Sequence, residues 1–419
     1  MKPRHIVIVG GGAAGFFGAI AAARTHTQAK VTLIEATHKP LAKVRISGGG
    51  RCNVTHACFE PRGLIQNYPR GGKALIGAFN RFQAKDTVDW FSKRGVKLKT
   101  EPDGRMFPVS DRSETIIDCL MKEANSLAVK LITANPVISV EVTATNGFEI
   151  TLNPRENKSQ EKKSQEKLQC NHLLLATGSN PIGYKIAQQL GHTVKKPVPS
   201  LFTFNIKDTQ LRELAGVSVK LARLRLNVPD NPQLEQTGSL LITHWGLSGP
   251  AVLKLSAWGA RMLHSHNYQG NLQVNWLPLL KQEEIREQLL SVKSEFPKRL
   301  VFSHRGIDLP HRLWQYMVTR AGIPPEKRWI DLPKKMLNKL VQEMTQTEFT
   351  VNGKGVFKDE FVTCGGVNLK EIDFKTMESK LIPGLHFAGE ILDIDGVTGG
   401  FNFQSAWTTG YLAGVAMGS

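Results

Sequence analysis

Residues 46–56, ISGGGRCNVTH, place three consecutive glycines beside an arginine, a cysteine and an asparagine. Glycines cost the folding chain more conformational entropy than other residues, so the triplet 48–50 predicts that another body lies close to the backbone. A phosphate, a metal ion, an RNA strand and a flat ring all satisfy that condition. The segment alone does not choose among them.

Two side chains have the chemistry of an acid or base. Cys52 lies in this basic segment, where a thiol with a lowered pKa can pass a proton to a carbon being reduced. His244 stands in THWGLSGP, ahead of a helix predicted to begin near Pro250, and its imidazole can exchange a proton with a substrate. The plainer interpretations stay open: Cys52 as a small buried side chain and His244 as a structural turn residue.

The N-terminal segment HIVIVGGGAAGFFGAIAAA predicts a strand at His5–Val9, a glycine turn and a buried helix. Gly10 permits the tight turn, Gly12 lets the backbone approach a pyrophosphate, and Gly15 lets helix and strand pack closely. The second predicted strand ends in Glu35, 20 residues past Gly15, where a carboxylate meets a ribose 2′-hydroxyl. We therefore predict a dinucleotide site, and the acid at position 35 disfavours NADP there.

The C-terminal segment 382–414 favours FAD over NAD as the resident dinucleotide. A strand at Leu385–Ala388 is followed by Gly389 and Glu390, whose carboxylate can hold a ribityl or phosphate-linked hydroxyl. A helix predicted to start near residues 399–402 would direct its positive end at the flavin pyrimidine edge. The strand HLLLATG, which ends at Gly178, is a further segment that NAD dehydrogenases rarely need.

Six motifs occur in the order GGGAAG, ISGGGRCNVTH, DGRMFPVSDRS, LLLATGSNPIG, THWGLSGPAVL and GEILDIDGVTGGFNFQSAW. Together they resemble the BaiN/YhiN-type flavoproteins, FAD-dependent oxidoreductases also described as aminoacetone-oxidase-like, over almost the whole chain. The resemblance implies an α/β fold, a glutathione-reductase-type FAD-binding Rossmann domain with an inserted β-rich and helical domain. Arg45 and the pair Thr55-His56 depart from the family pattern, so an identical substrate pocket is not implied.

With FAD as the cofactor, Arg51 and Lys43 can counter the pyrophosphate or an acidic substrate, and Asn53 can hydrogen-bond a ring edge. The candidate catalytic residues are Cys52 and His244, and no metal site is expected. The predicted cofactor-binding residues are Gly10, Gly12, Ala14, Gly15, Glu35, Lys43, Gly49, Arg51, Cys52, Asn53, Val137, Thr177, Gly178, Gly389, Glu390, Gly400, Phe401 and Asn402.

The predicted organisation is a first part of the FAD domain at 1–195, an insert at 196–355 and a C-terminal part of the FAD domain at 356–419. In the insert, KLARLRLNV alternates leucine with arginine, which predicts a strand with one buried and one basic face. KQEEIREQLLSVKSEF and LPKKMLNKLVQEMTQ have helical spacing. The tandem KSQEK at 158–167 predicts a solvated excursion without chemistry.

The formal net charge is +18, and it is concentrated in two stretches. Residues 43–112 hold 14 basic against 6 acidic residues, and residues 196–355 hold 22 against 13. Such an excess attracts polyanions, although a general solubility charge stays an alternative. Five cysteines without a CxxC pair, no apparent signal peptide and no apolar span long enough for a membrane predict a reduced, cytoplasmic setting.

Three functions follow as alternatives. The first is a reductase of an activated C=C bond with NAD(P)H as a transient donor, since no second G-x-G-x-x-G exists. The resemblance extends this to the uracil of ribosomal RNA. The second is an oxidase of a small amine, and the third is an RNA-binding flavoprotein with structural FAD. The substrate is thus a small molecule or ribosomal RNA, no membrane is involved, and the sequence carries no signal for an oligomeric state.

Overall fold

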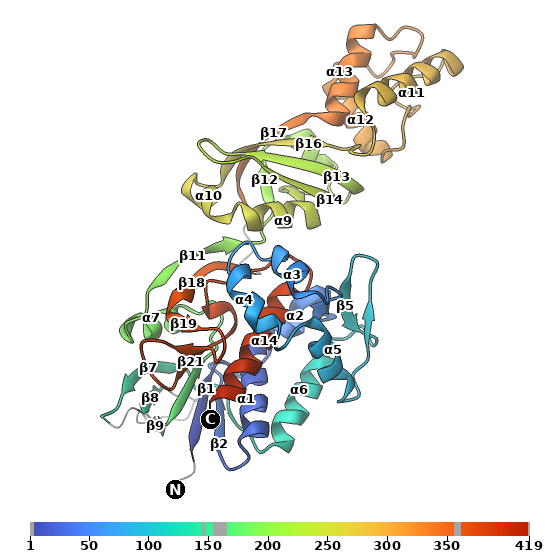
Figure 1. Cartoon of the computed structure of the whole chain (residues 1–419). Helices are drawn as coiled ribbons and strands as arrows, with labels where there is room; N and C mark the ends of the chain where they lie inside the picture. The colour runs from blue at the N-terminus through green and yellow to red at the C-terminus, as the bar shows by residue number, and fades with distance from the viewer. Residues whose placement is uncertain (1–3, 145–146, 154–165, 356–361, 418–419) are drawn as a thin grey trace, which may run out of the picture. The chain divides into compact units, whose positions relative to one another are not determined.

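The computed structural model describes residues 4–144, 147–153, 166–355 and 362–417, which divide into two compact units (Figure 1). Unit 1 comprises Met1–Pro197 and Val362–Ser419, and unit 2 comprises Val198–Phe361. The predicted boundaries lay after residues 195 and 355. The second of them borders residues 356–361, which are outside the described residues.

A seven-stranded sheet in the order β19-β20-β21-β10-β1-β2-β6 forms the centre of unit 1. The strands from β21 to β6 run parallel, and they are largely buried because helices cover such sheets on both faces. This arrangement confirms the predicted Rossmann-type fold. The bounds are β1 His5–Val9, β2 Lys30–Ile34, β6 Lys130–Ile132, β10 His172–Leu175, β19 Ile372–Asp373, β20 Glu378–Ser379 and β21 Leu385–Phe387.

The register of this sheet brings four strand ends into one row. Val9 pairs with Ile34 on one side and with Leu175 on the other, and Leu175 pairs with Phe387. The residues that follow these strands therefore meet at the carboxyl edge, where ligands bind in open α/β sheets.

Helices α1 (Ala13–Thr25) and α14 (Phe401–Ala416) lie side by side in unit 1 (Figure 1). Their contact depends on glycines, since a Cβ at Gly410 would lie 2.4 Å from the Ala14 carbonyl oxygen and one at Gly414 would lie 2.3 Å from that of Gly18. The C-terminal segment thus returns to the first helix of the chain.

Smaller elements surround the central sheet of unit 1. The sheets are β3-β5-β4, β7-β8-β9 and β11-β18. Their strands are β3 Thr55–His56, β4 Leu98–Thr100, β5 Arg105–Pro108, β7 Val137–Val142, β8 Phe148–Leu152, β9 Glu166–Cys170, β11 Val194–Ser200 and β18 Val362–Val367. The helices are α2 Ala42–Gly50, α3 Pro61–Leu64, α4 Gly72–Phe79, α5 Ala84–Ser92, α6 Glu114–Ser126 and α7 Pro181–Gln189, with the 3₁₀ turns η1 Ile65–Asn67, η2 Leu369–Glu371 and η3 Gly389–Ile391.

Unit 2 contains a closed barrel in the order β12-β15-β14-β13-β16-β17. Strand β13 carries the alternating segment, and its Leu224 and Leu226 are buried while Arg223 and Arg225 are half-buried, as predicted. The strands are β12 Phe204–Ile206, β13 Ser218–Asn227, β14 Leu234–Thr243, β15 Gly246–Ser248, β16 Gln269–Asn275 and β17 Thr347–Lys354.

The helices of unit 2 include the two that the sequence predicted by their spacing, α11 and α13. One continuous apolar core joins them to the barrel, and Trp276, Trp314 and Trp329 are fully buried in it. Helix α9 begins at Pro250, as predicted. The bounds are α8 Thr209–Glu213, α9 Pro250–Trp258, α10 Ala260–Ser265, α11 Gln282–Glu295, α12 His311–Arg320 and α13 Lys334–Thr345.

The tandem KSQEK at 158–167 lies mostly within residues 154–165, which are outside the described residues. The structure adds a strand that the sequence reasoning missed, since β9 begins at Glu166 and pairs antiparallel with β8. Within the described ranges, no helix combines the length and the apolar character needed to cross a membrane.

Candidate functional site

The three glycines in the turn from β1 into α1, Gly10, Gly12 and Gly15, differ in the space around them. Gly10 has φ of +113°, and a Cβ there would lie 2.3 Å from the Ala176 carbonyl oxygen. A Cβ at Gly15 would lie 1.8 Å from the Gly10 carbonyl oxygen, so close packing requires both of these glycines. A Cβ at Gly12 would have no described heavy atom within 4 Å. The space beside Gly12 is therefore open, which fits a pyrophosphate approaching the N-terminus of α1.

Glu35 follows β2 and holds the same turn. Its Oε2 accepts a hydrogen bond of 2.8 Å from the Gly11 N–H, and its Oε1 accepts bonds from the Thr37 N–H at 2.8 Å and from the Thr37 hydroxyl at 2.7 Å. The carboxylate is thus fixed at the edge where a ribose hydroxyl is expected. Sequence reasoning found Glu35 but missed Gly11 and Thr37, which give no signal of their own.

The ends of β10 and β21 bring four further predicted residues together. Lys43 forms an ion pair of 2.5 Å with Glu390, whose other oxygen accepts a bond of 2.9 Å from the Thr363 N–H. Gly178 has φ of +62°, and a Cβ there would lie 3.8 Å from Glu390 Oε2. Thr177 Oγ1 is buried without a hydrogen-bond partner among the described residues. This hydroxyl lies against the backbone of α7, since a Cβ at Gly183 would be 1.8 Å from it.

Gly389 packs against the first turn of α1. Its Cβ position lies 2.9 Å from the Ala14 Cβ, and its N–H donates to the Thr409 hydroxyl at 2.9 Å. Val137 begins β7 and is buried. For Ala14, Val137 and Gly389, contact with a cofactor stays a prediction.

The glycine triplet forms a left-handed stretch at the end of α2. The φ angles are 58°, 70° and 85° for Gly48, Gly49 and Gly50, a conformation that glycine adopts without strain. A Cβ at Gly48 would lie 2.7 Å from the Phe107 ring, whereas Cβ atoms at Gly49 and Gly50 would meet nothing within 4 Å. The first glycine therefore serves internal packing, and the other two border open space.

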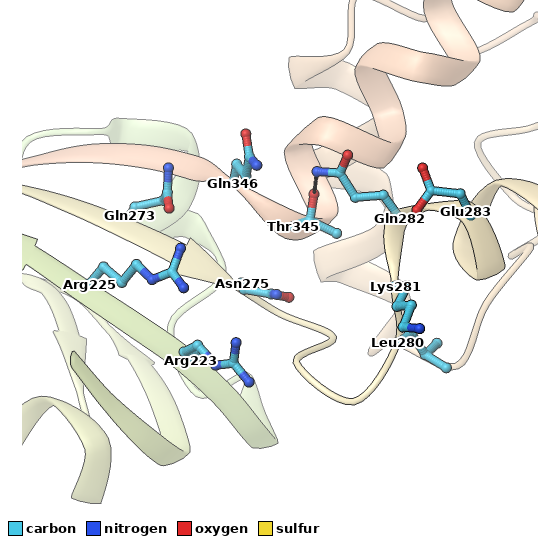
Figure 2. Close-up of a pocket in the computed structure, with 10 residues that line it drawn as sticks. All are labelled: Arg223, Arg225, Gln273, Asn275, Leu280, Lys281, Gln282, Glu283, Thr345 and Gln346. Atoms are coloured by element: carbon cyan, nitrogen blue, oxygen red, sulfur yellow. Dashed lines mark hydrogen bonds between the residues drawn. The ribbon is translucent and has the colours of Figure 1, made fainter.

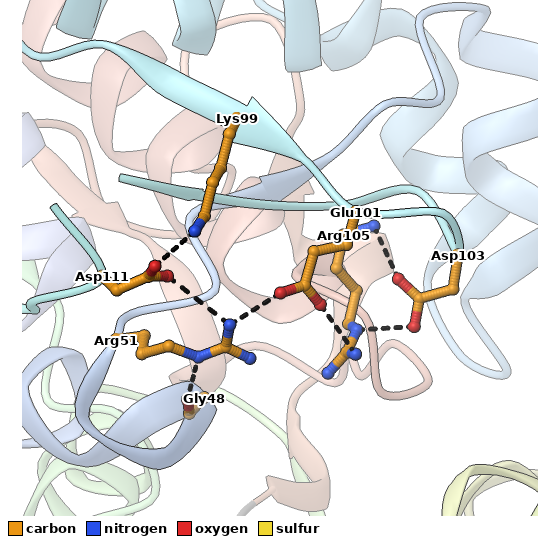
Figure 3. Close-up of polar contacts among 7 residues, drawn as sticks. All are labelled: Gly48, Arg51, Lys99, Glu101, Asp103, Arg105 and Asp111. Carbon is orange, nitrogen blue, oxygen red and sulfur yellow. Dashed lines mark hydrogen bonds and ion pairs between the residues drawn. The ribbon is translucent and has the colours of Figure 1, made fainter. Parts of the chain in front are cut away.

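Arg51 lies over the Phe107 ring, 4.0 Å from its centroid. It also belongs to a group of ion pairs (Figure 3). Its guanidinium pairs with Glu101 at 2.6 Å and with Asp111 at 3.5 Å. The hydrogen bond and charge of Glu101 raise the pKa of Arg51. The charge predicted to counter a pyrophosphate or an acidic substrate is thus compensated by two carboxylates.

The loop at 103–113 was predicted either to line a flavin pocket or to be held by ion pairs. Lys99 pairs with Asp111, while Arg105 pairs with Asp103 at 2.7 Å and with Glu101 at 3.0 Å (Figure 3). These contacts agree with the second alternative.

Cys52 is fully buried and has a positive φ of 62°, which is uncommon for a residue with a side chain. Burial raises the pKa of its thiol to about 12. Of the two interpretations of Cys52, the structure agrees with the small buried side chain and not with a thiol of lowered pKa, because the thiol is shielded from water. Cys52 stays protonated at neutral pH.

Asn53 connects the glycine triplet to the N-terminus of α14. Its amide nitrogen donates to the Thr55 carbonyl at 3.1 Å, and its oxygen accepts from the Gly400 N–H at 2.9 Å. Gly400 has φ of 92°, and the helix begins at Phe401 as predicted. This side chain therefore fixes the helix terminus. Its predicted bond to a flavin ring edge remains a prediction.

The side chains of Phe401 and Asn402 hold the same terminus in place. Phe401 stacks on His56 with ring centroids 4.7 Å apart, and its carbonyl accepts from the Tyr68 hydroxyl at 2.6 Å. Asn402 bonds both the N–H and the carbonyl of Gly396 at 2.8 Å. The first turn of α14 has no acidic residue, so its free N–H groups present a positive end suited to the anionic edge of a reduced flavin.

Two buried acids escaped the sequence reasoning. Asp395 forms an ion pair with Arg70, and Asp393 pairs with Lys195 at 2.6 Å. Two acids inside the apolar run ILDIDGV are a signal that could have revealed them, because buried carboxylates require partners.

His244 belongs to unit 2, in the turn between β14 and β15, and its side chain is exposed. The residues gathered at the carboxyl edge of the sheet all belong to unit 1, so that group forms without it. Among the described residues, no cluster of three or more histidine, cysteine, aspartate or glutamate side chains is arranged to hold a metal ion.

The chain is similar to known proteins over nearly its whole length. The family described as HI0933-like protein Rossmann domain matches residues 4–416. The chain is 31% identical to the ribosomal RNA dihydrouridine synthase of Escherichia coli, covering 98% of this chain and 97% of that protein. It is 28% identical to the 3-dehydro-bile acid delta(4,6)-reductase of Clostridium scindens, covering 98% of both. The crystal structure of 3-ketosteroid-delta4-(5alpha)-dehydrogenase from Rhodococcus jostii covers all of both chains with a TM-score of 0.51 at 14% identity, a likeness in fold.

Proposed function

The chain belongs to the HI0933-like family of FAD-dependent oxidoreductases, and from this premise we propose that it reduces the C5=C6 bond of a uridine in ribosomal RNA. We further propose NAD(P)H as the electron donor and the cytoplasm as the location. The observation that carries the proposal is the match, over nearly the full length of both chains, to a ribosomal RNA dihydrouridine synthase. The net charge of +18 supports a polyanionic substrate.

The residues of unit 1 fit FAD. The open space at Gly12 and the N-terminus of α1 would hold the pyrophosphate, and Glu35 would hold the ribose. The N-terminus of α14, fixed by Asn53, would lie beside the flavin pyrimidine edge. FAD, when bound, supplies hydride transfer to an activated carbon–carbon double bond.

The cations near these residues are paired with carboxylates. This supports a site in which backbone N–H groups of the protein, more than charged side chains, bind FAD. Lys43 and Arg51 are engaged with Glu390, Glu101 and Asp111, so they orient carboxylates and loops. We assign Cys52 a packing role next to the glycine triplet, because a thiol with a pKa of about 12 is a poor proton donor at neutral pH. His244 stays our candidate for the acid that protonates the substrate.

A second candidate is the reduction of a C=C bond in a small steroid-like acid. The similarity to the bile acid reductase of Clostridium scindens, at 28% identity over 98% of both chains, favours it. Such a substrate does not require the cationic excess, and for this reason we rank it second.

The deciding experiment measures dihydrouridine in ribosomal RNA by mass spectrometry in a deletion strain. We expect the modification to disappear and to return with the wild-type chain, but not with Gly12→Val. The purified protein should also lose its yellow colour anaerobically with NADH or NADPH, which would identify the donor. Ribosomal RNA that is unchanged by the deletion would overturn the proposal, and oxygen-dependent turnover of a small amine would favour the oxidase instead.

A further inference from the structure

Unit 2 contains a pocket of about 330 Å³ between the barrel and the helices that extend from it (Figure 2). Arg223 and Arg225 of β13 and Gln273 and Asn275 of β16 form its barrel side. The first residues of α11 and the end of α13 form the opposite side. A cavity of this volume is large enough for a small ligand group.

The cations of the pocket exceed its acids. Arg223 and Arg225 lie two residues apart on one face of β13, and they share a single carboxylate, that of Glu235, at 3.7 Å and 2.6 Å. Lys281 adds a positive charge and Glu283 removes one. Two guanidinium groups facing one space are suited to the oxygens of a phosphate, which they can bind in pairs of hydrogen bonds.

The remaining lining consists mainly of hydrogen-bonding groups. Gln282 donates to the Thr345 hydroxyl at 2.9 Å (Figure 2). The Asn275 side chain accepts from the Leu277 N–H at 2.9 Å. The pocket also borders the N-terminus of α11, where Glu283 and Glu284 occupy the first turn and the Glu284 carboxylate accepts from the Lys281 N–H at 2.6 Å. This terminus therefore adds no net attraction for an anion. The polar side chains and the two guanidinium groups together favour a phosphate over an apolar ligand.

We propose that this pocket binds a phosphate group of the RNA backbone and thereby holds the RNA substrate on unit 2. The pocket would recognise a phosphate ester. That this phosphate belongs to RNA, and not to NADPH, rests on the proposed function. The pocket would position RNA for modification without taking part in the reduction.

Unit 2 carries further cations outside the pocket, beyond α11, whose own four acidic residues outnumber its two basic ones. A second group of cations separate from the pocket suits a polymer better than a single nucleotide. Helix α11 spans about 20 Å, and the loop after it carries Lys298 and Arg299. The backbone of this loop pairs with that of Lys327 and Arg328, through Val301 N–H to the Lys327 carbonyl and Trp329 N–H to the Arg299 carbonyl, both at 2.9 Å. None of these four cations has an ion pair among the described residues.

The test compares the charge-removing double variant Arg223→Gln/Arg225→Gln with wild type in the full-length, FAD-loaded protein. Anisotropy of a fluorescent, uridine-containing single-stranded RNA gives the dissociation constant between about 50 and 200 mM salt. We expect binding about tenfold weaker at low salt and a salt slope reduced by about one for each phosphate that the protein no longer neutralises. The matched control Arg62→Gln/Lys85→Gln removes the same charge from exposed positions of unit 1 and should have a smaller effect.

A second variant tests the pocket independently, in case the first variant fails to fold. Asn275→Asp adds a negative charge to the pocket but keeps the oxygen that accepts from Leu277, so it should weaken RNA binding while FAD absorbance and the melting temperature stay unchanged. Equal losses in the pocket and control variants would overturn the proposal. A pocket variant that weakens NADPH binding and leaves RNA binding intact would also overturn it.

The proposal and the proposed function fail in different ways. RNA that binds through the pocket but is never reduced would refute the proposed function and leave the pocket assignment standing. Dihydrouridine formation and RNA affinity that are both unchanged in Arg223→Gln/Arg225→Gln would refute the pocket and leave the function standing.

Discussion

The cations near the predicted FAD residues of unit 1 and those of the pocket in unit 2 are compensated by carboxylates to different degrees. In unit 1, the cations near the predicted FAD residues are paired with carboxylates, as in Lys43 with Glu390 and Arg51 with Glu101. In unit 2, two pocket arginines share one carboxylate, and the cations of the paired loops at 298–299 and 327–328 have no ion pair among the described residues. The cations beside the predicted FAD residues are thus compensated by carboxylates more fully than those of the pocket in unit 2.

The difference shows how each unit can bind an anion. Unit 1 presents backbone N–H groups at the starts of α1 and α14, beside glycines that leave space, so a pyrophosphate needs no dedicated cation there. Unit 2 presents side-chain cations, which attract a polyanion by releasing its counterions. Cofactor binding should therefore depend on the geometry of the glycines and little on salt concentration. RNA binding should depend strongly on salt concentration and little on these glycines.

The largest expected effect is on FAD binding in Gly12→Val. The site has no described heavy atom within 4 Å of the new Cβ, so the apoprotein should fold normally while the side chain fills the pyrophosphate space. We expect loss of FAD from the purified protein, measured by absorbance, with RNA affinity unchanged. Gly77→Val is the matched control, because its Cβ is also uncrowded and lies on the exposed face of α4. Stoichiometric FAD in Gly12→Val would contradict the assignment of this turn.

The next largest effect concerns Cys52, whose thiol pKa is raised from 9.0 to about 12 by burial. At pH 8 its thiolate fraction should be about a thousandfold below that of an unperturbed thiol, so iodoacetamide should spare it in the native protein. Cys58, which is half-buried, is the comparison within the chain. Native labelling of Cys52 at the rate of Cys58 would show that the thiol is accessible.

The same shift predicts the sign of a pH effect. The unfolded chain loses the Cys52 proton at a lower pH than the folded chain, so the free energy of unfolding should decrease as the pH rises above about 9. Cys52→Ala should make this alkaline decrease shallower in urea titrations. It should leave FAD absorbance at neutral pH unchanged, in keeping with a packing role.

Features encoded within short segments could be predicted from the sequence. The fingerprint turn, Glu35 at the end of β2 and the start of α14 at Phe401 each depend on neighbouring residues and backbone geometry. Packing around Gly10 and Gly15 agrees with the roles that their spacing indicated.

Features that depend on distant partners could not be predicted. Arg51 is compensated by Glu101, which is 50 residues away and reaches it through the β4-β5 hairpin. The burial of Cys52 follows from the same folding of the chain, and for that reason the sequence left open whether its thiol is buried or has a lowered pKa. The pocket of unit 2 is lined by residues of β13, α11 and α13, and no local sequence pattern reveals that these segments lie close together.

A smaller effect on FAD is expected for Glu35→Ala, which removes the acceptor of three hydrogen bonds at the carboxyl edge. Loss of a charged hydrogen bond to the ribose should weaken FAD binding by about 1–3 kcal/mol, measured by titration of the apoprotein. Thr37→Val removes only a hydroxyl that bonds Glu35 and should have a lesser effect. An unchanged dissociation constant in Glu35→Ala would remove this residue from the site.

The smallest expected effect is a gain in RNA affinity, and it tests whether compensation of charge is what distinguishes the units. Glu235 is the carboxylate that Arg223 and Arg225 share, and its side chain is 44% exposed. Exposed ion pairs contribute little to stability, so Glu235→Gln should fold normally while it frees both guanidinium groups for a phosphate. Affinity for RNA should then rise a few-fold, on the order of 1 kcal/mol or less, with a steeper salt dependence and unchanged FAD content. The corresponding change in unit 1, Glu101→Gln, removes one of the two carboxylates beside Arg51 and leaves Asp111, so it should leave RNA affinity unaltered. An equal gain in both variants would mean that the two sites do not differ in this way.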